Sequence, residues 1–295
     1  MALRWPEGYR CAAVLSFDVD AESPMPYRQP DTWLAGLGEF EQRTYGPRRG
    51  IPRILDLLAR YGVPGSFYIP AYTIRRYPGM VSAVAAAGHE IGCHGDIHEL
   101  VDQLSEEEEE AILARSIAAI TAVAGLSPVG YRSPSWELHR RSPALLRRYG
   151  LLYDSSLMGD DRPYLITTPD GPLAELPVQW LLDDAVYYRA TPPAGVARLL
   201  DHPAQVAATW IAEFDGLAAD GGCFILTLHP WISGRPSRIA ALERVIEHIR
   251  RRDDVWWATC ADLARHAHAH ADEIEYVLDP ADLPATVSLS DRPGG

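Results

Sequence analysis

Short apolar runs alternate with longer amphipathic segments along most of this chain, and no other sequence feature constrains the fold as much. Runs of strand length occupy residues 12–17, 65–70, 89–93, 129–132, 151–153, 174–178, 223–228 and 255–258. Segments with the apolar spacing of helices lie between them, at residues 51–61, 78–87, 105–124, 203–219 and 236–252. This alternation predicts an α/β fold with a largely parallel sheet. A chain of 295 residues is long enough for one α/β barrel.

We expect a single domain over residues 1–272 and a C-terminal tail over residues 273–295. No internal repeat, low-complexity tract or linker divides the first of these ranges. The tail is polar and contains proline, which indicates either an oligomerisation arm or a loosely ordered end. Two connections, at residues 21–50 and 179–203, are long enough to suggest functional loops, and we expect substrate specificity to reside there.

The composition is that of an ordinary soluble protein, with 47% hydrophobic and 23% charged residues. A net charge of −13 disfavours nucleic acid or an anionic membrane surface as the main partner. The N-terminal stretch does not resemble a secretory signal, and no apolar run approaches the roughly 18 residues of a membrane span, so we expect a cytoplasmic protein. The four cysteines contain no C-x-x-C pair, which favours buried, reduced thiols.

Polar residues suited to catalysis recur where the predicted strands end. They are Asp18 and Asp20 after the first strand, His94 and His98 after the third, Arg132 at the end of the fourth and His229 after a later one. In a parallel barrel the carboxyl ends of all strands open onto one face, where active sites are built. We therefore expect these side chains to form one site.

The spacing of His94 and His98 allows both imidazoles to reach one metal ion if the backbone turns between them. Asp18 and Asp20 are two positions apart, so both can face the same way from an extended strand. One aspartate and two histidines would leave a coordination position for water, as in catalytic zinc sites. Zinc is the default for this ligand set, although Co²⁺, Ni²⁺ or Mn²⁺ also fits. An isolated H-x-x-x-H pattern is a weak signal, and a core or surface histidine pair is its ordinary alternative.

Four motifs in sequence order resemble those of the polysaccharide deacetylase family, also called the NodB-homology or carbohydrate esterase family 4 group. They are FDVD at residues 17–20, HGDIH at 94–98, RSPSW at 132–136 and LTLHP at 226–230. The resemblance runs from about Val14 to Ala258, most of the chain. It implies a distorted TIM-like (β/α) barrel of the NodB-homology type.

The resemblance, rather than the spacing, distinguishes the roles of the site residues. It implies that Asp20, His94 and His98 bind the metal, that Asp18 is the general base paired with Arg132, and that His229 is the general acid. The backbone amide of Ser135 would hold the oxyanion, and Asp183 or Asp184 would pair with His229. The remaining candidates for substrate contact are Trp136, Trp180, Asp183, Trp231 and Arg235, for which core packing, an exposed loop or helix capping are competing explanations.

The first motif reads Asp-Val-Asp instead of the adjacent Asp-Asp pair of the best-known members, and Ser135 replaces a tyrosine of the third motif. With HPWISGRP at residues 229–236, these departures look more like the branch of peptidoglycan-deacetylase-like proteins, allantoinases and cyclic-imide hydrolases. That branch implies an intracellular tetramer acting on a small amide, imide or amino sugar. Its allantoinases are thought to work without metal and have altered ligand positions, so the intact ligand set here favours a metalloenzyme.

The sequence therefore predicts a metal-dependent hydrolase of non-peptide carbon–nitrogen bonds that removes an N-acyl group or opens a cyclic amide or imide. A true peptidoglycan or amino-sugar N-deacetylase is one alternative. A non-catalytic binding barrel of the same family is another.

Overall fold

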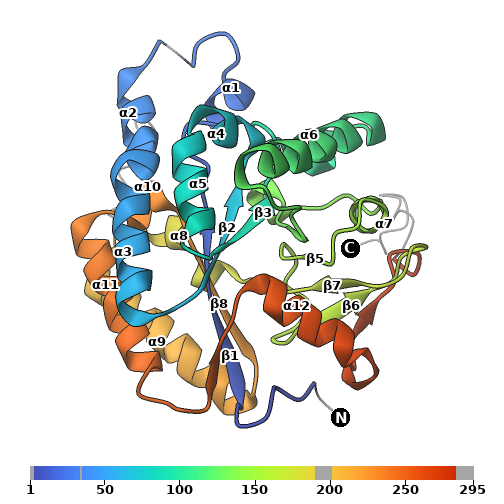
Figure 1. Cartoon of the computed structure of the whole chain (residues 1–295). Helices are drawn as coiled ribbons and strands as arrows, with labels where there is room; N and C mark the ends of the chain where they lie inside the picture. The colour runs from blue at the N-terminus through green and yellow to red at the C-terminus, as the bar shows by residue number, and fades with distance from the viewer. Residues whose placement is uncertain (1–2, 34, 190–200, 284–295) are drawn as a thin grey trace, which may run out of the picture.

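The computed structural model describes residues 3–33, 35–189 and 201–283 (Figure 1). Its strands are β1 (Cys11–Asp18), β2 (Gly65–Ile69), β3 (Glu90–Cys93), β4 (Gly130–Tyr131), β5 (Tyr153–Asp154), β6 (Tyr164–Ile166), β7 (Leu173–Glu175), β8 (Cys223–Leu228), β9 (Val255–Trp257) and β10 (Val277–Leu278). Its helices are α1 (Pro24–Arg28), α2 (Leu37–Tyr45), α3 (Ile51–Tyr61), α4 (Ala71–Arg76), α5 (Pro78–Ala86), α6 (Glu106–Ala124), α7 (Ser142–Arg148), α8 (Asp184–Tyr188), α9 (Pro203–Asp220), α10 (Pro230–Ser233), α11 (Pro236–Ile249) and α12 (Cys260–Ala269).

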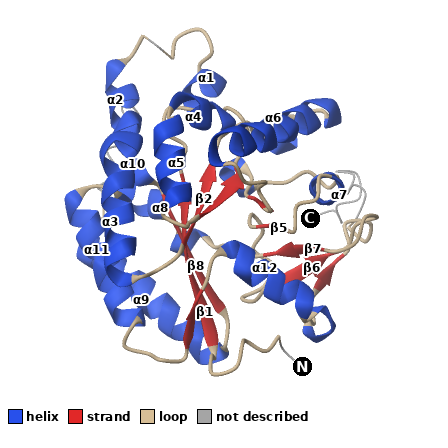
Figure 2. Ribbon diagram, viewed as in Figure 1, coloured by secondary structure: helices blue, strands red, loops and turns tan. Residues whose placement is uncertain are grey.

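The strands form one curled sheet in the order β10-β6-β7-β5-β4-β3-β2-β1-β8, and β9 pairs with the beginning of β1. Figure 2 shows the sheet surrounded by helices, with α3, α9 and α11 along the side of β1 and β8. Every strand pairing among the described residues is parallel except that of β6 with β7. Beyond β8, a single bridge between Asp183 and Thr227 joins the segment after β7 to the sheet. The predicted distorted TIM-like (β/α) barrel is confirmed. Beside β8, this single bridge replaces a full ladder of hydrogen bonds between strands.

The alternation of side chains along the strands separates an outer core from the inside of the barrel. In β1, Ala13, Leu15 and Phe17 pack in the outer hydrophobic cluster against the surrounding helices. The intervening residues Ala12 and Val14 belong to a second, inner cluster. The same alternation places the side chains of Ser16 and Asp18 inside the barrel, with Asp18 nearer to the carboxyl end of the strand.

The helix α12 closes the amino end of the barrel. Its small buried residues, among them Ala264 and Ala267, pack in the inner cluster with Tyr68 and Tyr153. The backbone amide of Cys260 donates to the Ser66 hydroxyl over 2.8 Å, at the start of β2. The packing of α12 thus fills this end of the barrel and leaves the carboxyl end of the strands for the pocket.

The structure differs from the sequence prediction mainly in the connections. Residues 21–50 are not simply a loop, because they contain α1, α2 and a π-helical turn at Gly46–Gly50. In the second long connection, α8 is present and residues 190–200 lie outside the described residues. Part of the predicted tail is ordered, since β10 pairs with β6, and residues 284–295 are not described.

The four cysteines are buried and unpaired, as predicted. Among the described residues, no helix combines the length and the apolar character needed to cross a membrane.

Candidate active site

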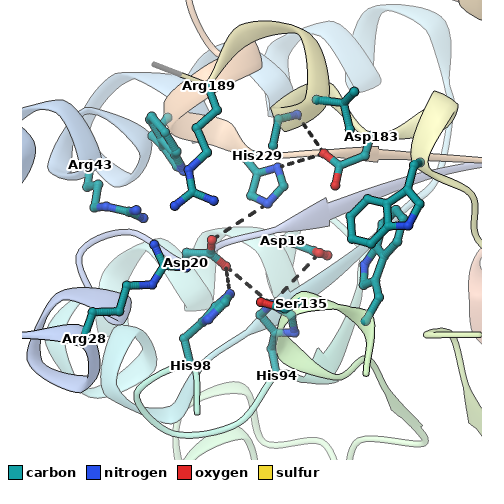
Figure 3. Close-up of a pocket in the computed structure, with 15 residues that line it drawn as sticks. Asp18, Asp20, Arg28, Arg43, His94, His98, Ser135, Asp183, Arg189 and His229 are labelled. Carbon is teal, nitrogen blue, oxygen red and sulfur yellow. Dashed lines mark hydrogen bonds and ion pairs between the residues drawn. The ribbon is translucent and has the colours of Figure 1, made fainter. Parts of the chain in front are cut away.

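A pocket of about 240 Å³ opens at the carboxyl end of the central strands (Figure 3). It is lined by Asp18, Asp20, Arg28, Arg43, His94, His98, Ser135, Trp136, Trp180, Asp183, Ala185, Val186, Arg189, His229 and Trp231. The structure thus brings together the residues of all four sequence motifs. Of the residues predicted from the strand ends, Asp18, Asp20, His94, His98 and His229 line this one cavity, and Arg132 lies behind it in contact with Asp18.

Asp20, His94 and His98 form a buried group whose ligand atoms all lie within 4.8 Å of one another. Asp20 Oδ1 is 3.4 Å from His94 Nε2 and 3.7 Å from His98 Nε2. Two ligands that each bind zinc at about 2.1 Å in tetrahedral geometry are about 3.4 Å apart. The spacing of these atoms therefore fits a divalent metal ion.

Hydrogen bonding in this group also fits a metal. His94 Nδ1 lies 2.8 Å from the carbonyl oxygen of Arg132, so Nδ1 must be the donor, and in the neutral imidazole Nε2 then carries the lone pair. Buried His94 Nε2 and Asp20 Oδ1 have no hydrogen-bond partner among the described residues. Burial lowers the pKa of His98 to about 3, which leaves the imidazole in the neutral form that binds metals.

The loop after β3 turns sharply between the two histidines, at two residues with positive φ. Gly95 has φ +70°, and a Cβ there would lie 3.0 Å from Glu99 Oε2. The same Glu99 oxygen accepts the backbone amides of Asp96 and Ile97 over 2.9 and 3.0 Å. His98 itself has φ +64°, a conformation that non-glycine residues rarely adopt outside functional sites. The backbone turn that the H-x-x-x-H spacing requires is thus present.

Asp18 is held by Arg132 rather than by the histidines. Arg132 Nη1 donates to Asp18 Oδ1 over 2.9 Å and also to the hydroxyls of Ser16 and Thr227 over 2.8 and 3.2 Å. The guanidinium is fully buried. Its Nε donates to the backbone carbonyl oxygen of Ser155, and its Nη2 donates to the Ser155 hydroxyl. Asp18 Oδ2 lies 4.0 Å from His94 Nε2. One carboxylate oxygen is therefore fixed while the other faces the histidine side of the pocket.

His229 faces Asp20 from the opposite side, with its Nε2 3.8 Å from Asp20 Oδ2. Its Nδ1 lies 2.7 Å from Asp184 Oδ1, and its backbone amide donates to Asp184 Oδ2 over 2.9 Å. Burial favours the neutral imidazole, but the charge and hydrogen bond of Asp184 and the charges of Asp183 and Asp20 raise the pKa of His229 to about 10. At neutral pH this side chain is an imidazolium whose Nε2 proton is available to a ligand in the pocket.

The structure distinguishes the two aspartates that the sequence offered as partners of His229. Asp184 is fully buried and makes the direct contact, whereas Asp183 Oδ1 lies 3.7 Å from His229 Nδ1. Asp183 lines the pocket and caps α8 by accepting the backbone amide of Ala185 over 2.7 Å.

The aromatic candidates line the pocket, but Arg235 does not. The rings of Trp136 and Trp180 stack with centroids 4.5 Å apart, and Trp180 is 49% exposed at the pocket rim. Ser135 and Trp136 both have positive φ, which turns the chain across the pocket after Arg132. The guanidinium of Arg235 lies 3.6 Å from the centre of the Tyr45 ring, so this arginine stacks on α2 and stays out of the pocket.

Sequence reasoning missed three arginines that line the pocket, Arg28, Arg43 and Arg189. They lie in the two long connections, where no periodic pattern indicates which side chains turn inward. The only signal for them was the length of those connections.

Comparison with known proteins agrees with this geometry. The family profile "Polysaccharide deacetylase" matches residues 44–153. A peptidoglycan deacetylase from Helicobacter pylori is 29% identical over 266 residues, covering 79% of this chain and 90% of the relative. A Mycobacterium smegmatis crystal structure, provisionally named a polysaccharide deacetylase, is 42% identical with a TM-score of 0.88, covering 93% of this chain and 95% of that one. A PuuE allantoinase shares the fold, with 24% identity, a TM-score of 0.81 and coverage of 92% and 94%.

The profile match includes the histidine motif, and the alignment with the Mycobacterium protein covers nearly the whole chain. This chain belongs to the polysaccharide deacetylase family.

Proposed function

We propose that this protein is a metal-dependent hydrolase that removes an N-acyl group or opens a cyclic amide or imide. Family membership supports hydrolysis of a carbon–nitrogen bond. The observation that carries the metal dependence is the buried group of Asp20, His94 and His98, with its unpartnered ligand atoms. Zn²⁺ is the expected ion, and Co²⁺, Ni²⁺ or Mn²⁺ also suits these ligands.

A divalent ion held by these three residues would supply Lewis acidity, lowering the pKa of water and polarising the scissile carbonyl group. Asp18 is the group that would accept the proton of the attacking water, because Oδ1 is fixed by Arg132 while Oδ2 faces His94 and accepts no hydrogen bond from the described residues. We assign the oxyanion to the backbone amide of Ser135, which lines the pocket in a left-handed turn.

His229 would donate its Nε2 proton to the leaving nitrogen. Its Nδ1 is engaged by Asp184, so only Nε2 faces the pocket. An imidazolium with a raised pKa holds its proton at neutral pH, so the acid form is present when the leaving nitrogen must be protonated. The two proton-transferring groups, Asp18 and His229, both line the pocket that Asp20 also lines.

The stacked rings of Trp136 and Trp180 provide a flat apolar surface beside this machinery. Such a surface suits a planar imide or ureide and also a sugar ring. The Helicobacter pylori relative is a peptidoglycan deacetylase, which favours an amino-sugar substrate as the second candidate.

The test is a substrate panel measured with zinc-reconstituted protein. It contains N-acetylglucosamine oligomers, N-acetyl amino acids, hydantoins and cyclic imides. Turnover of small amides or imides alone supports the first candidate, and turnover of the sugar oligomers supports the second. If no member is hydrolysed, the non-catalytic binding barrel replaces both.

A further inference from the structure

Three arginines converge on one side of the pocket, beside Asp20 (Figure 3). Arg28 ends α1, Arg43 lies in α2, and Arg189 directly follows α8. They come from the two long connections that follow different strands. Positive charge gathered at one point is unexpected in a chain whose net charge is −13.

Arg43 is built into the pocket wall. The residue is 3% exposed, and its Nε donates to Glu39 Oε1 over 2.8 Å. Its Nη1 lies 3.4 Å from the carbonyl oxygen of Ala21, and its guanidinium lies 5.0 Å from the centre of the Trp231 ring. Burying a guanidinium is costly unless its donors and charge are satisfied. These contacts therefore keep a fixed cation in the wall, unlike an ordinary surface arginine.

The pocket's own carboxylates do not neutralise the other two arginines. Within the part of the chain that the structure describes, Arg28 and Arg189 form no ion pair, and both are exposed. The carboxylates that line the pocket are engaged elsewhere: Asp18 with Arg132, Asp183 as the cap of α8 and Asp20 within the metal-ligand group.

The three cations are also close enough to repel one another. Desolvation lowers the pKa of Arg28, and the positive charges of Arg189 and Arg43 lower it further, against weaker effects of Asp20 and Glu39. A ligand with negative oxygen atoms would relieve this repulsion. Guanidinium groups match carboxylate and phosphate oxygens with paired, charge-assisted hydrogen bonds.

We propose that Arg28, Arg43 and Arg189 bind an oxyanion group of the substrate, carboxylate or phosphate, and so select oxyanion-bearing amides over neutral ones. This inference rests on the proposed function, because the same pocket would hold the scissile bond. The pocket volume of about 240 Å³ suits a small molecule that places its anionic group at the arginines and its amide beside Asp18.

The test measures binding rather than turnover, by isothermal titration calorimetry on the Asp18→Asn protein. One matched pair is an N-acetyl amino acid and its primary amide, and the other is N-acetylglucosamine 6-phosphate and N-acetylglucosamine. Each pair is titrated into three proteins, all of which carry Asp18→Asn. The first carries no further substitution, the second also carries Arg28→Met and Arg189→Met, and the third also carries Arg244→Met. Arg244 is an exposed arginine of α11 that does not line the pocket, which makes it the matched control.

We expect the oxyanion member of at least one pair to bind about tenfold or more tightly than its neutral partner. That ratio should approach 1 in the double arginine variant and persist in Arg244→Met, and the pair that shows it identifies carboxylate or phosphate. The proposal is overturned if neither oxyanion member binds more tightly, or if the preference survives loss of both arginines. Absence of metal-dependent turnover with the preference intact would instead count against the proposed function alone.

Discussion

Asp18 and Asp20 show how two identical side chains, separated by one residue, acquire different chemistry. Both face the inside of the barrel because β1 continues into an extended segment. Asp18 meets the buried guanidinium of Arg132, whereas Asp20 meets the imidazoles of His94 and His98. These contacts support the proposal that the first accepts a proton and the second binds the metal.

Substitution separates these two roles. Asp18→Asn should lower kcat by about 10²- to 10⁴-fold, the usual contribution of a general base, while metal content stays at the wild-type level. Asp20→Asn should lose the metal. Both are checked by elemental analysis beside steady-state kinetics, with thermal melts to confirm folding because Asp18→Asn removes the charge opposite Arg132. Loss of metal from Asp18→Asn, with retention in Asp20→Asn, would show the roles to be reversed.

The contact of His229 with Asp184 predicts how kcat depends on pH. Although burial favours the neutral imidazole, Asp184 is the largest influence that raises the pKa of His229 to about 10. The acid form is therefore present at neutral pH and is lost as pH rises through about 10. Asp184→Asn should move the alkaline limb of the kcat profile to lower pH.

The matched control is Asp215→Asn, because Asp215 pairs with His248 over 2.8 Å at the protein surface. Its profile should coincide with that of the wild type. An alkaline limb that does not move in Asp184→Asn would exclude His229 as the acid.

At the scale of elements, the strands that place the site were the most predictable part of the chain. The apolar runs at residues 12–17 and 223–228 correspond to β1 and β8, and the helical segment predicted at residues 105–124 is α6, which begins with a capping box of Ser105 and Glu108. These features depend on local periodicity and short-range hydrogen bonds, which the sequence carries directly.

Other elements could not be predicted because their positions depend on distant contacts. The strand β6 contains three residues, too few for a clear period, and was not predicted. A strand was predicted at residues 174–178, where β7 lies in part, but its antiparallel pairing with β6 was not foreseen. The choice between Asp183 and Asp184 depends on the exact turn into α8. The three pocket arginines share no spacing, since they meet only in the folded molecule.

The loop between β3 and α6 gives a prediction at this scale. Gly95→Ala would place a Cβ 3.0 Å from Glu99 Oε2 at a position with φ +70°, costing about 1–2 kcal/mol in the free energy of unfolding. Moving Glu99 would release the amides of Asp96 and Ile97, so metal affinity should fall. Chemical denaturation and competitive metal titration measure the two effects.

The control is Gly62→Ala. Gly62 also has a positive φ, at the end of α3, but a Cβ added there would lie in open space. It should lose stability without losing metal affinity. Equal metal affinity in Gly95→Ala and the wild type would contradict the role given to Glu99.

For the whole molecule, a buried carboxyl pair links stability to pH. Asp154 of β5 and Glu175 of β7 are partners in register, and Asp154 Oδ2 and Glu175 Oε2 have no hydrogen-bond partner among the described residues. Burial raises the pKa of Asp154 to about 6 and raises that of Glu175 well above its usual range. The folded protein therefore keeps protons that the unfolded chain releases above about pH 4.

This pair stabilises the fold at low pH, and its contribution is lost progressively as pH rises above about 4 and through the raised pKa values of the two carboxyl groups. Glu175→Gln should remove about 1–3 kcal/mol of that dependence, because an amide needs no proton to donate to Asp154. Urea denaturation at pH 4.5 and at pH 8 gives the change in the free energy of unfolding between these two pH values. This change is compared between the wild type and Glu175→Gln. An identical pH dependence of stability in wild type and variant would contradict the role given to this carboxyl pair.

The assembly state is a separate prediction at the same scale. The tetramer implied by the family branch is measured by light scattering of the full chain.

The central claim is that Asp20, His94 and His98 hold a divalent ion on which hydrolysis depends. The most direct measurement is the metal content of protein purified without chelator, together with turnover before chelation, after chelation and after zinc is restored. We predict one divalent ion per chain, loss of turnover with loss of the ion and recovery on its return, with no ion bound to His98→Ala. Metal-free protein whose turnover is unchanged by chelation would contradict the account.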